Sequence, residues 1–391
     1  MAVRKGIVKA IRPRTRASLQ PCRRRPSRGR WLIPAKRNET LEPCGSFGGV
    51  GASGHGLRRR TVAAALGAAV AATLISVGAA AGSGGALAWK PVARNPAASG
   101  KGQVTNLSCV PGGFCLTISL SGQTAVWDGS SWRLAPAISH SVAFVSGVSC
   151  VTSSFCVAIG SHSTTKRTVN YAVTWTGSSW QAPVKLYTDA GEGGEYDLVH
   201  GVSCTSTSFC MVLGNVGSLV WDGAGWSKRR GATGGTDGNG VLSCASSRFC
   251  ANIHDNLPNY WNGSSWRWAS TESLGEAIPR DEAFISELSC VSASFCVAVD
   301  TRTPPLIWDG HSWLYSTVRG RAPALTSVSC TTTAFCVATS STTGLALEWD
   351  GASWTPTSPL GLSRLPTVVS CSATKRCLAL TDKGASAVTT P

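Results

Sequence analysis

Two short runs of acidic residues carry the side chains best suited to chemistry in this chain of 391 residues. The first run holds Asp189, Glu192, Glu195, Tyr196 and Asp197, and the second holds Glu272, Glu276, Asp281 and Glu282. Carboxylates clustered around glycines suit calcium or a basic ligand, although their spacing follows no defined calcium loop. Charge that keeps a nearly neutral domain soluble explains the same residues. Both interpretations stay open, and the nine residues form the candidate ligand-binding set.

Catalysis is the second use that carboxylates suggest, because glycoside hydrolysis needs two carboxyl groups flanking one bond. Glu195 with either Glu276 or Glu282 is the pair that the sequence offers, so these three are the candidate catalytic residues. A sialidase-like site would also need an arginine cluster and a tyrosine with an acidic partner. Glu195-Tyr196 supplies the tyrosine, but the arginines are scattered. We therefore expect a binding module, with a glycan-active hydrolase as the alternative.

Fourteen of the sixteen cysteines form seven pairs, each with five residues between its members. The pairs are Cys109/Cys115, Cys150/Cys156, Cys204/Cys210, Cys244/Cys250, Cys290/Cys296, Cys330/Cys336 and Cys371/Cys377. Zinc would need four ligands in close reach, but no repeat has a second pair and the histidines do not recur in phase. The spacing predicts seven disulfides within the repeats and an oxidising compartment. Beyond the calcium considered above, no cofactor is expected, and Cys22 and Cys44 have no assigned role.

Six cysteine pairs are followed by a second phrase, in which two Trp flank Asp, Asn or Thr, then Gly and two further residues. The Trp pairs are Trp127/Trp132, Trp175/Trp180, Trp221/Trp226, Trp261/Trp266, Trp308/Trp313 and Trp349/Trp354. First cysteines recur every 40 to 54 residues, a period typical of structural units stacked around a ring or along a rod. Because the Trp pairs keep one register, we interpret them as packing rather than as sugar-binding platforms.

Each repeat has the pattern of four short strands separated by Gly, Ser and Pro turns, which predicts an antiparallel meander. The seventh repeat stops before its Trp-initiated fourth strand, whereas residues 86–92, before the first repeat, look like a lone fourth strand. An open rod has no use for such complementary ends. The sequence therefore predicts an all-β protein: a seven-bladed β-propeller with four-stranded antiparallel blades, closed by an N-terminal strand near Trp89.

Two resemblances follow from these motifs. The Gly-x-Ser-Trp segment, as at Gly129 to Trp132, resembles the second half of the Asp-box, or BNR, hairpin of sialidase-like propellers. The first half differs, because Trp stands where an Asp-box has Asp. The full combination of Ser-Cys-x5-Cys with Trp-Asp-Gly-x-Ser-Trp over residues 86–391 more closely resembles uncharacterised exported propeller proteins of actinobacteria. That resemblance implies a fold and a location rather than an activity.

The predicted propeller has two unlike faces. The turns between first and second strands, and between third and fourth, have constant lengths and share one face, which we call the turn face. The other connections share the opposite face, the loop face, and contain all the length variation: an insertion near residues 161–170 and longer connections after the second and fourth repeats. Both of the latter are acidic. Since variable loops are where function is usually tuned, we expect the ligand on the loop face.

The formal charge of +16 lies almost entirely in the first sixty residues, which hold sixteen Lys and Arg against two acids. Residues 61–391 carry twenty against eighteen, too little excess to neutralise nucleic-acid phosphates. Residues 1–57 are basic and without periodicity, as expected of a disordered segment. A translation start placed too far upstream explains them more simply than a cytoplasmic tail.

Residues 58–88 have the features of an export signal: Arg58-Arg59-Arg60, an apolar run over 61–81 and an Ala-x-Ala ending at Ala88. We expect cleavage near Trp89, with an uncleaved signal anchor as the alternative, since the run is long enough to span a bilayer. Residues 89–391 would form the propeller. The expected protein is secreted or extracytoplasmic and monomeric, contacts membrane only through this segment, and binds a glycan or protein ligand.

Overall fold

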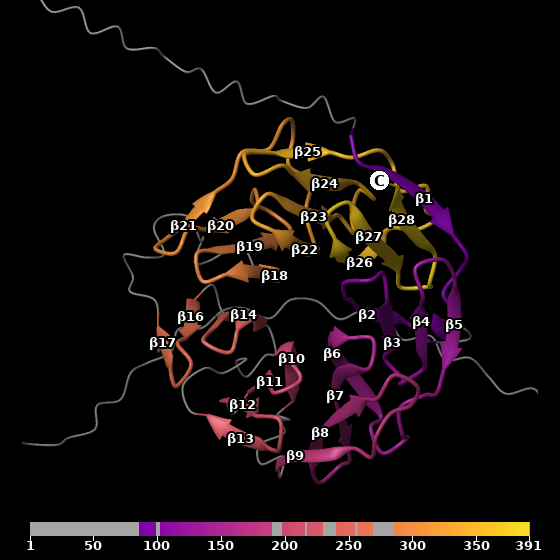
Figure 1. Ribbon diagram of the computed structural model, residues 1–391, viewed down its shortest axis with the longest axis vertical. Coiled ribbons are helices and arrows are strands. Elements are labelled where there is room, and N and C mark those ends of the chain that lie inside the picture. Colours follow the sequence, from indigo (N-terminus) through magenta and orange to yellow (C-terminus); the bar gives the residue numbers. More distant parts are fainter. Residues whose placement is uncertain are drawn as a thin grey trace, which may run out of the picture. The chain divides into compact units, whose positions relative to one another are not determined.

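The computed structural model describes residues 86–98, 102–189, 198–215, 217–229, 240–254, 257–268 and 285–390, which belong to one compact unit, Ala79–Pro391. Seven separate four-stranded antiparallel sheets stand around a common centre (Figure 1). This confirms the predicted seven-bladed β-propeller. The described residues include a single short 3-10 helix, η1 (Pro96–Ala98), and no helix long and apolar enough to cross a bilayer.

The first three blades follow one another along the chain, each beginning with its innermost strand. Blade 1 consists of β2 (Val104–Cys109), β3 (Cys115–Ser119), β4 (Thr124–Trp127) and β5 (Trp132–Ala135). Blade 2 consists of β6 (Phe144–Thr152), β7 (Phe155–Ser163), β8 (Thr168–Trp175) and β9 (Val184–Asp189). Blade 3 consists of β10 (Val199–Ser206), β11 (Phe209–Gly214), β12 (Gly217–Trp221) and β13 (Trp226–Arg229).

The next three blades keep the same strand order. Blade 4 consists of β14 (Val241–Ser246), β15 (Phe249–His254), β16 (Leu257–Trp261) and β17 (Trp266–Trp268). Blade 5 consists of β18 (Ile285–Ser292), β19 (Phe295–Asp300), β20 (Leu306–Trp308) and β21 (Trp313–Tyr315). Blade 6 consists of β22 (Ser327–Thr332), β23 (Phe335–Thr339), β24 (Ala346–Trp349) and β25 (Trp354–Pro356).

Blade 7 joins the two ends of the ring. Its strands are β26 (Pro366–Ala373), β27 (Arg376–Thr381), β28 (Ser386–Thr390) and, from the N-terminal side, β1 (Ala88–Val92). Strand β1 pairs antiparallel with β28, with Trp89 opposite Thr389. Because this pairing covers the outer edge of blade 7, the closure that the sequence predicts is confirmed.

The propeller includes residues just upstream of Trp89. Leu87 is buried in a core cluster with residues of blades 6 and 7, and its carbonyl accepts a hydrogen bond of 3.0 Å from the Ser358 amide. Ala88 pairs with Thr390 inside β1. A cleavage that removed these two residues would therefore remove part of the closing strand.

The hydrophobic core lies between successive blades. One cluster joins Ala251 and Ile253 of blade 4 to Leu288 and Ala298 of blade 5. Second strands are the most buried, and every residue of β11 and of β19 is buried. A strand covered on both sides by neighbouring sheets needs apolar residues on both of its faces, which explains runs such as the one beginning at Phe295.

The seven predicted disulfides are all present. In each blade the two cysteines are directly opposite across the first two strands, with Cα atoms 3.9 to 4.0 Å apart. Such a close approach is typical of a non-hydrogen-bonded antiparallel pair, in which the main-chain amides point away from the partner. The amide of the first cysteine is thereby left on the open inner edge of the blade.

A ring of seven serines hydrogen-bonds these open amides. The serine immediately before each first cysteine accepts a hydrogen bond of 2.9 to 3.0 Å from the first cysteine amide of the next blade. Ser370 of blade 7 completes the circle by accepting from Cys109 of blade 1. Each inner strand is thus attached to its neighbour without a continuous sheet, and exposed edges around the channel are reduced.

The Trp-Asp-Gly phrase builds the turn between third and fourth strands. Asp309 accepts hydrogen bonds of 2.8 Å from the His311 and Ser312 amides, and Gly310 takes a positive φ of 98°. These contacts also lower the pKa of the Asp309 carboxyl. The same turn recurs at Asp128, Asp222, Asn262 and Asp350. The side chain caps the turn, and glycine supplies the left-handed backbone at no steric cost.

Eight of the twelve phrase tryptophans are buried and the other four, Trp132, Trp180, Trp221 and Trp226, are half-buried, as expected of packing residues. Trp313 is 1% and Trp354 0% exposed, and paired rings lie with centroids 5.4 to 5.9 Å apart. The second Trp also ties neighbouring blades together: the indole N–H of Trp313 donates to the Tyr260 hydroxyl of the preceding blade at 2.8 Å. Apolar area and a satisfied indole N–H both contribute to the junction.

Candidate functional site

Only one member of the predicted acidic set lies within the described residues. Asp189 ends β9 and is paired with Thr168 at the beginning of β8. The other predicted residues, which are Glu192, Glu195, Tyr196, Asp197, Glu272, Glu276, Asp281 and Glu282, lie outside the described residues. The acidic ligand site and the catalytic pair drawn from these residues therefore stay predictions.

The disulfide cysteines are the other residues that the sequence singles out, and the structure confirms them as seven pairs within the repeats. Although both cysteines of a pair flank a surface turn, the second one lies in the interior. Five of these second cysteines are 0% exposed: Cys156, Cys210, Cys250, Cys296 and Cys336. The cause is their position at the beginning of the second strand, which neighbouring blades cover on both sides. These five cysteines have no exposed surface, so their role is to stabilise the hairpins.

The insertion in the second repeat forms a raised edge on the loop face. Strands β7 and β8 continue their pairing as far as Ser163 and Thr168, and a tight turn held by the Thr164 hydroxyl connects them. Lys166 and Arg167 are exposed at its tip. Because Asp189 pairs with Thr168, the outer strand β9 reaches the same height, and the acidic connection begins there.

The loop face is also hollowed between blades 6 and 7. A cavity of about 370 Å³ is bordered by Gly344, Leu360 and Leu365, and an adjoining one of about 340 Å³ by Arg364 and Asp382. Leu365 borders both cavities and is 44% exposed, so it gives them an apolar surface that solvent can reach. The described part of the loop face thus has a ridge on blade 2 and a partly apolar depression on the opposite side of the ring.

Among the described residues, one carboxylate lines the central channel. A cavity of about 200 Å³ is lined by the inner strands and includes His200 and Glu287. Glu287 Oε2 accepts a 3.0 Å hydrogen bond from the Val328 amide of the next blade. Desolvation raises the pKa of Glu287 to about 7, against hydrogen bonds from Ser327 and Val328 that act in the opposite direction. The equivalent position, three residues before the first cysteine, holds a different residue in the other repeats, such as Asn106 in blade 1 and Val368 in blade 7. A glutamate at this position is therefore a feature of blade 5 alone.

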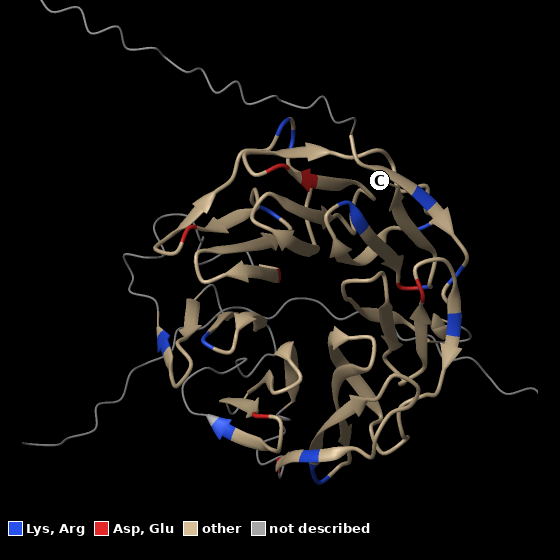
Figure 2. Ribbon diagram, in the orientation of Figure 1, with Lys and Arg blue, Asp and Glu red and all other residues tan. Residues whose placement is uncertain are grey.

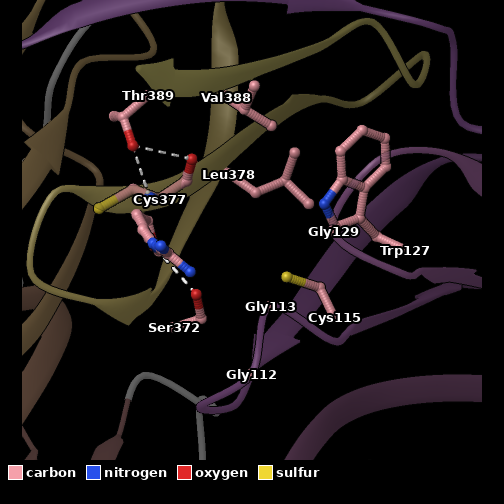
Figure 3. A pocket seen from close by; sticks show the side chains of 11 residues that line it. Gly112, Gly113, Cys115, Trp127, Gly129, Ser372, Cys377, Leu378, Val388 and Thr389 are labelled. Carbon is pink, nitrogen blue, oxygen red and sulfur yellow. Dashed lines mark hydrogen bonds between the residues drawn. The ribbon is translucent and has the colours of Figure 1, made fainter. Parts of the chain in front are cut away.

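A fourth cavity interrupts the otherwise uniform turn face, between blades 7 and 1 (Figure 3). Its volume is about 260 Å³, and its lining includes Trp127, Arg376 and Thr389 together with the turn glycines Gly112 and Gly129. Figure 3 shows the indole nitrogen of Trp127 turned toward the Leu378 side of this cavity. We call this the seam cavity, because it lies where the first and last blades meet.

Charged side chains elsewhere in the described residues lie mainly on the outside. Lys and Arg mark the outermost strands β1, β5, β9, β13 and β17 (Figure 2). Among the described residues there is no group of three or more His, Cys, Asp or Glu that could hold a metal ion. The four cavities contain two carboxylates, Glu287 and Asp382, and these lie in different cavities. The described residues therefore provide binding surfaces and no paired-carboxylate site.

Solved structures with the same fold place the chain among the β-propellers. The chain is similar to YCF48 bound to D1 peptide, with a TM-score of 0.56, 11% identity and coverage of 78% of this chain and 97% of that one. It is similar to YCF48 from Cyanidioschyzon merolae (TM-score 0.55, 13% identity, coverage 78% and 99%). The WD40 β-propeller domain of Doa1 gives a TM-score of 0.54 and 13% identity, with coverage of 77% and 97%.

At these identities the likeness concerns the fold alone. No protein-family model and no curated protein matches the chain. The class of protein is thus defined by its architecture, and its function has to be argued from its own residues.

Three features are missing from the sequence-based prediction: the serine ring, the seam cavity and Glu287. Two of them have a signal in the sequence that could have revealed them. The serine ring has a clear signal, since Ser precedes the first cysteine in all seven repeats. The seam cavity also has one, because Arg376 occupies the position that is Phe in the other six repeats. Glu287 has none: nothing in the sequence shows that its position faces the channel.

Proposed function

We propose that this protein is an exported binding module that holds a glycan or protein ligand on its loop face. The observation that carries the proposal is the contrast between the faces. The turn face repeats one Asx-type turn in five blades, whereas the loop face has a raised β7–β8 edge and hollows between blades 6 and 7. Surface features that differ from blade to blade are what a single ligand needs.

Export is supported by the disulfides. Seven of them within a protein of this size are consistent with an extracellular location, because cytosolic thiols are kept reduced. The charge-free segment before the propeller agrees, whether it is removed or retained as an anchor. In either case membrane contact is confined to the N-terminal segment, and we propose a monomer that binds no nucleic acid.

The acidic connections after blades 2 and 4 are proposed as the contact residues. Asp189 begins the first connection at the height of the blade 2 ridge, which is also where the exposed Lys166 and Arg167 lie. A surface with both charges suits a polar ligand. Calcium bound by the acidic connections is a cofactor that this proposal accommodates.

The direct test is binding of the purified protein to a glycan array, with calcium and with a chelator. We expect defined glycans to be retained by the protein. Changing Glu192, Glu195, Asp197, Glu276 and Asp281 to their amides should abolish the signal and leave the melting temperature within about 2 °C, since each amide keeps the size of the carboxylate it replaces. A ligand that binds this variant as well as the parent would contradict the loop-face proposal.

Hydrolysis of a glycan is the second candidate function, and the same purified protein distinguishes it from binding. Turnover of any glycoside that disappears in Glu195→Gln or Glu282→Gln would assign chemistry to the acidic connections. Retention of intact glycan by the parent protein over a prolonged incubation supports recognition alone.

A further inference from the structure

The seam cavity arises because a contact made in five blades is missing on both of its sides. In blades 2 to 6 the first Trp of the phrase lies over the cysteine turn, and its indole N–H donates to a turn carbonyl at 3.0 to 3.1 Å. The acceptor is always the third residue after the first cysteine, as in Trp308 to Ala293. This bond closes the turn face over each of those blades.

Blade 7 has no such tryptophan. Thr389 occupies the position, opposite Trp89, and its hydroxyl accepts from the Cys377 amide and donates to the Lys375 carbonyl, both at 2.8 Å. A threonine fills far less space than an indole, so the volume above β28 stays open. The adjacent Arg376 replaces a phenylalanine that is buried or half-buried in the other blades.

Blade 1 has the tryptophan and lacks the acceptor. Its cysteine turn reads Val-Pro-Gly-Gly-Phe, and Gly112 and Gly113 both adopt positive φ, at 95° and 87°. This different turn leaves the indole N–H of Trp127 without a hydrogen-bond partner among the described residues, although the side chain is only 4% exposed. The Trp127 nitrogen is not among the fully buried unpartnered side-chain atoms of the described residues, so it keeps contact with solvent and can donate to a molecule in the cavity.

We propose that the seam cavity is a binding site for a small carboxylate, no larger than one sugar acid or one amino-acid unit. The Arg376 guanidinium and the Trp127 N–H would be its two donors. A volume of about 260 Å³ is below the usual range for drug-sized ligands, which sets the size limit. Arginine recognises a carboxylate through two parallel N–H donors, and an indole N–H adds a third direction.

The local charge agrees with an anionic ligand. No Asp or Glu is among the residues that line the cavity. The nearest carboxylate along the chain, Asp128, accepts hydrogen bonds from the Ser130 and Ser131 amides and lies 3.7 Å from Arg133. Arg376 forms no ion pair within the described part of the chain. The cavity therefore presents donors without an internal anion to satisfy them.

This site is independent of the loop-face proposal, since it lies on the opposite face and uses none of the same residues. The junction of blades 7 and 1 departs from the Phe and Trp packing of the other blades, which argues against a purely structural role. Had the ring needed only closure, the Phe and Trp used in the other blades would have filled the junction.

The test is an NMR titration of the full chain labelled with 15N-tryptophan, in which the Trp127 indole resonance is assigned from Trp127→Phe. D-glucuronate and N-acetyl-L-glutamate are the carboxylate probes. D-glucose and N-acetyl-L-glutamine are their neutral counterparts. We expect the Trp127 resonance to move with one or both acids and to stay in place with the neutral compounds. The acid that acts at lower concentration identifies the source of the carboxylate.

Two variants separate recognition from general effects. Arg376→Gln should lower the affinity for the carboxylate probe about tenfold or more, because a charge-assisted hydrogen bond is lost. Arg248→Gln is the matched control, since Arg248 is an exposed arginine in the cysteine turn of blade 4, above a Trp261 that keeps its turn bond of 3.0 Å. It should leave the affinity unchanged.

A filling variant checks the cavity itself. Thr389→Trp restores the residue of the other blades and should abolish binding while the disulfides and melting temperature are retained. If neither acid shifts Trp127, if the neutral compounds act equally, or if Arg376→Gln and Thr389→Trp bind as the parent does, the proposal is wrong.

Discussion

The two faces of this propeller follow different rules, although the same seven repeats build both. On the turn face, one disulfide hairpin, one Asx-type turn and one indole-to-carbonyl bond recur from blade to blade, and the seam is the exception. On the loop face, blade 2 rises in an extended hairpin and blades 6 and 7 enclose hollows. Recurrence indicates residues that hold the ring together, and departures from it mark the places where we propose that a ligand binds.

The largest effect should come from a recurring turn-face residue. Trp313→Ala should lower the free energy of unfolding by about 3–5 kcal/mol, because Trp313 is 1% exposed and donates its indole N–H to Tyr260. Urea denaturation measures the change. Leu314→Ala, at a neighbouring site that is 52% exposed, should change it by less than about 0.5 kcal/mol. Equal losses of unfolding free energy in the two variants would contradict the view that the recurring tryptophans hold the ring together.

Removing one recurring disulfide should have the next largest effect. Cys290→Ala with Cys296→Ala should cost about 2 kcal/mol, since the closed loop is short and restricts the unfolded chain only modestly. The urea midpoint measures it, with the parent protein, in which all seven disulfides are intact, as reference. Loss of the whole fold on removing this single bridge would show that the hairpins, and not the packed tryptophans, dominate the turn face.

Glu287 is the one charged residue at its position among the seven blades, and its charge should make the stability of the protein depend on pH. Its pKa is raised from 4.5 to about 7 in the folded protein, so protonation favours folding. Stability from this group should be complete below about pH 4.5 and be lost as the pH rises through 7, by on the order of 3 kcal/mol. Glu287→Gln should flatten the pH dependence of the urea midpoint over this window. An unchanged profile would place the carboxyl in a more solvated setting.

The serine ring should give the smallest effect. Ser289→Ala removes the acceptor of the Cys330 amide and should cost about 1 kcal/mol. Ser294→Ala, at an exposed turn position, is the control. A loss confined to the ring serine, together with faster amide exchange at Cys330, would sharpen the distinction between recurring contacts and variable surface.

The N-terminal boundary offers a separate check. Because Leu87 is buried and Ala88 belongs to β1, we expect the mature protein to retain Leu87. N-terminal sequencing of exported material decides this. A mature chain beginning at Trp89 would show that the ring closes without the Leu87 contact.

Much of this fold is predictable because its information is repeated. The spacing of Cys290 and Cys296 predicts both a hairpin and its disulfide, and the missing strand of the last repeat predicts the role of Trp89. The sites are harder, because they rest on single residues. Glu287 differs from its equivalents without any local signal, and the unpartnered Trp127 N–H follows from the backbone of a distant pair of glycines. The acidic connections that include Glu195 and Glu276 lie outside the described residues, and their arrangement stays a prediction.

Removing negative charge from each face in turn tests the central claim most directly. The loop-face variant carries amides at Glu192, Glu195, Asp197, Glu276 and Asp281, and the turn-face variant carries Asn at Asp128, Asp222, Asp309 and Asp350. Asn262 already makes the same turn, with the Ser264 and Ser265 amides each 3.0 Å away, so the second variant should fold normally. On the glycan array, we predict loss of binding in the loop-face variant and full binding in the turn-face variant. Retained binding in the first, or loss in the second alone, would contradict the assignment of recognition to the loop face.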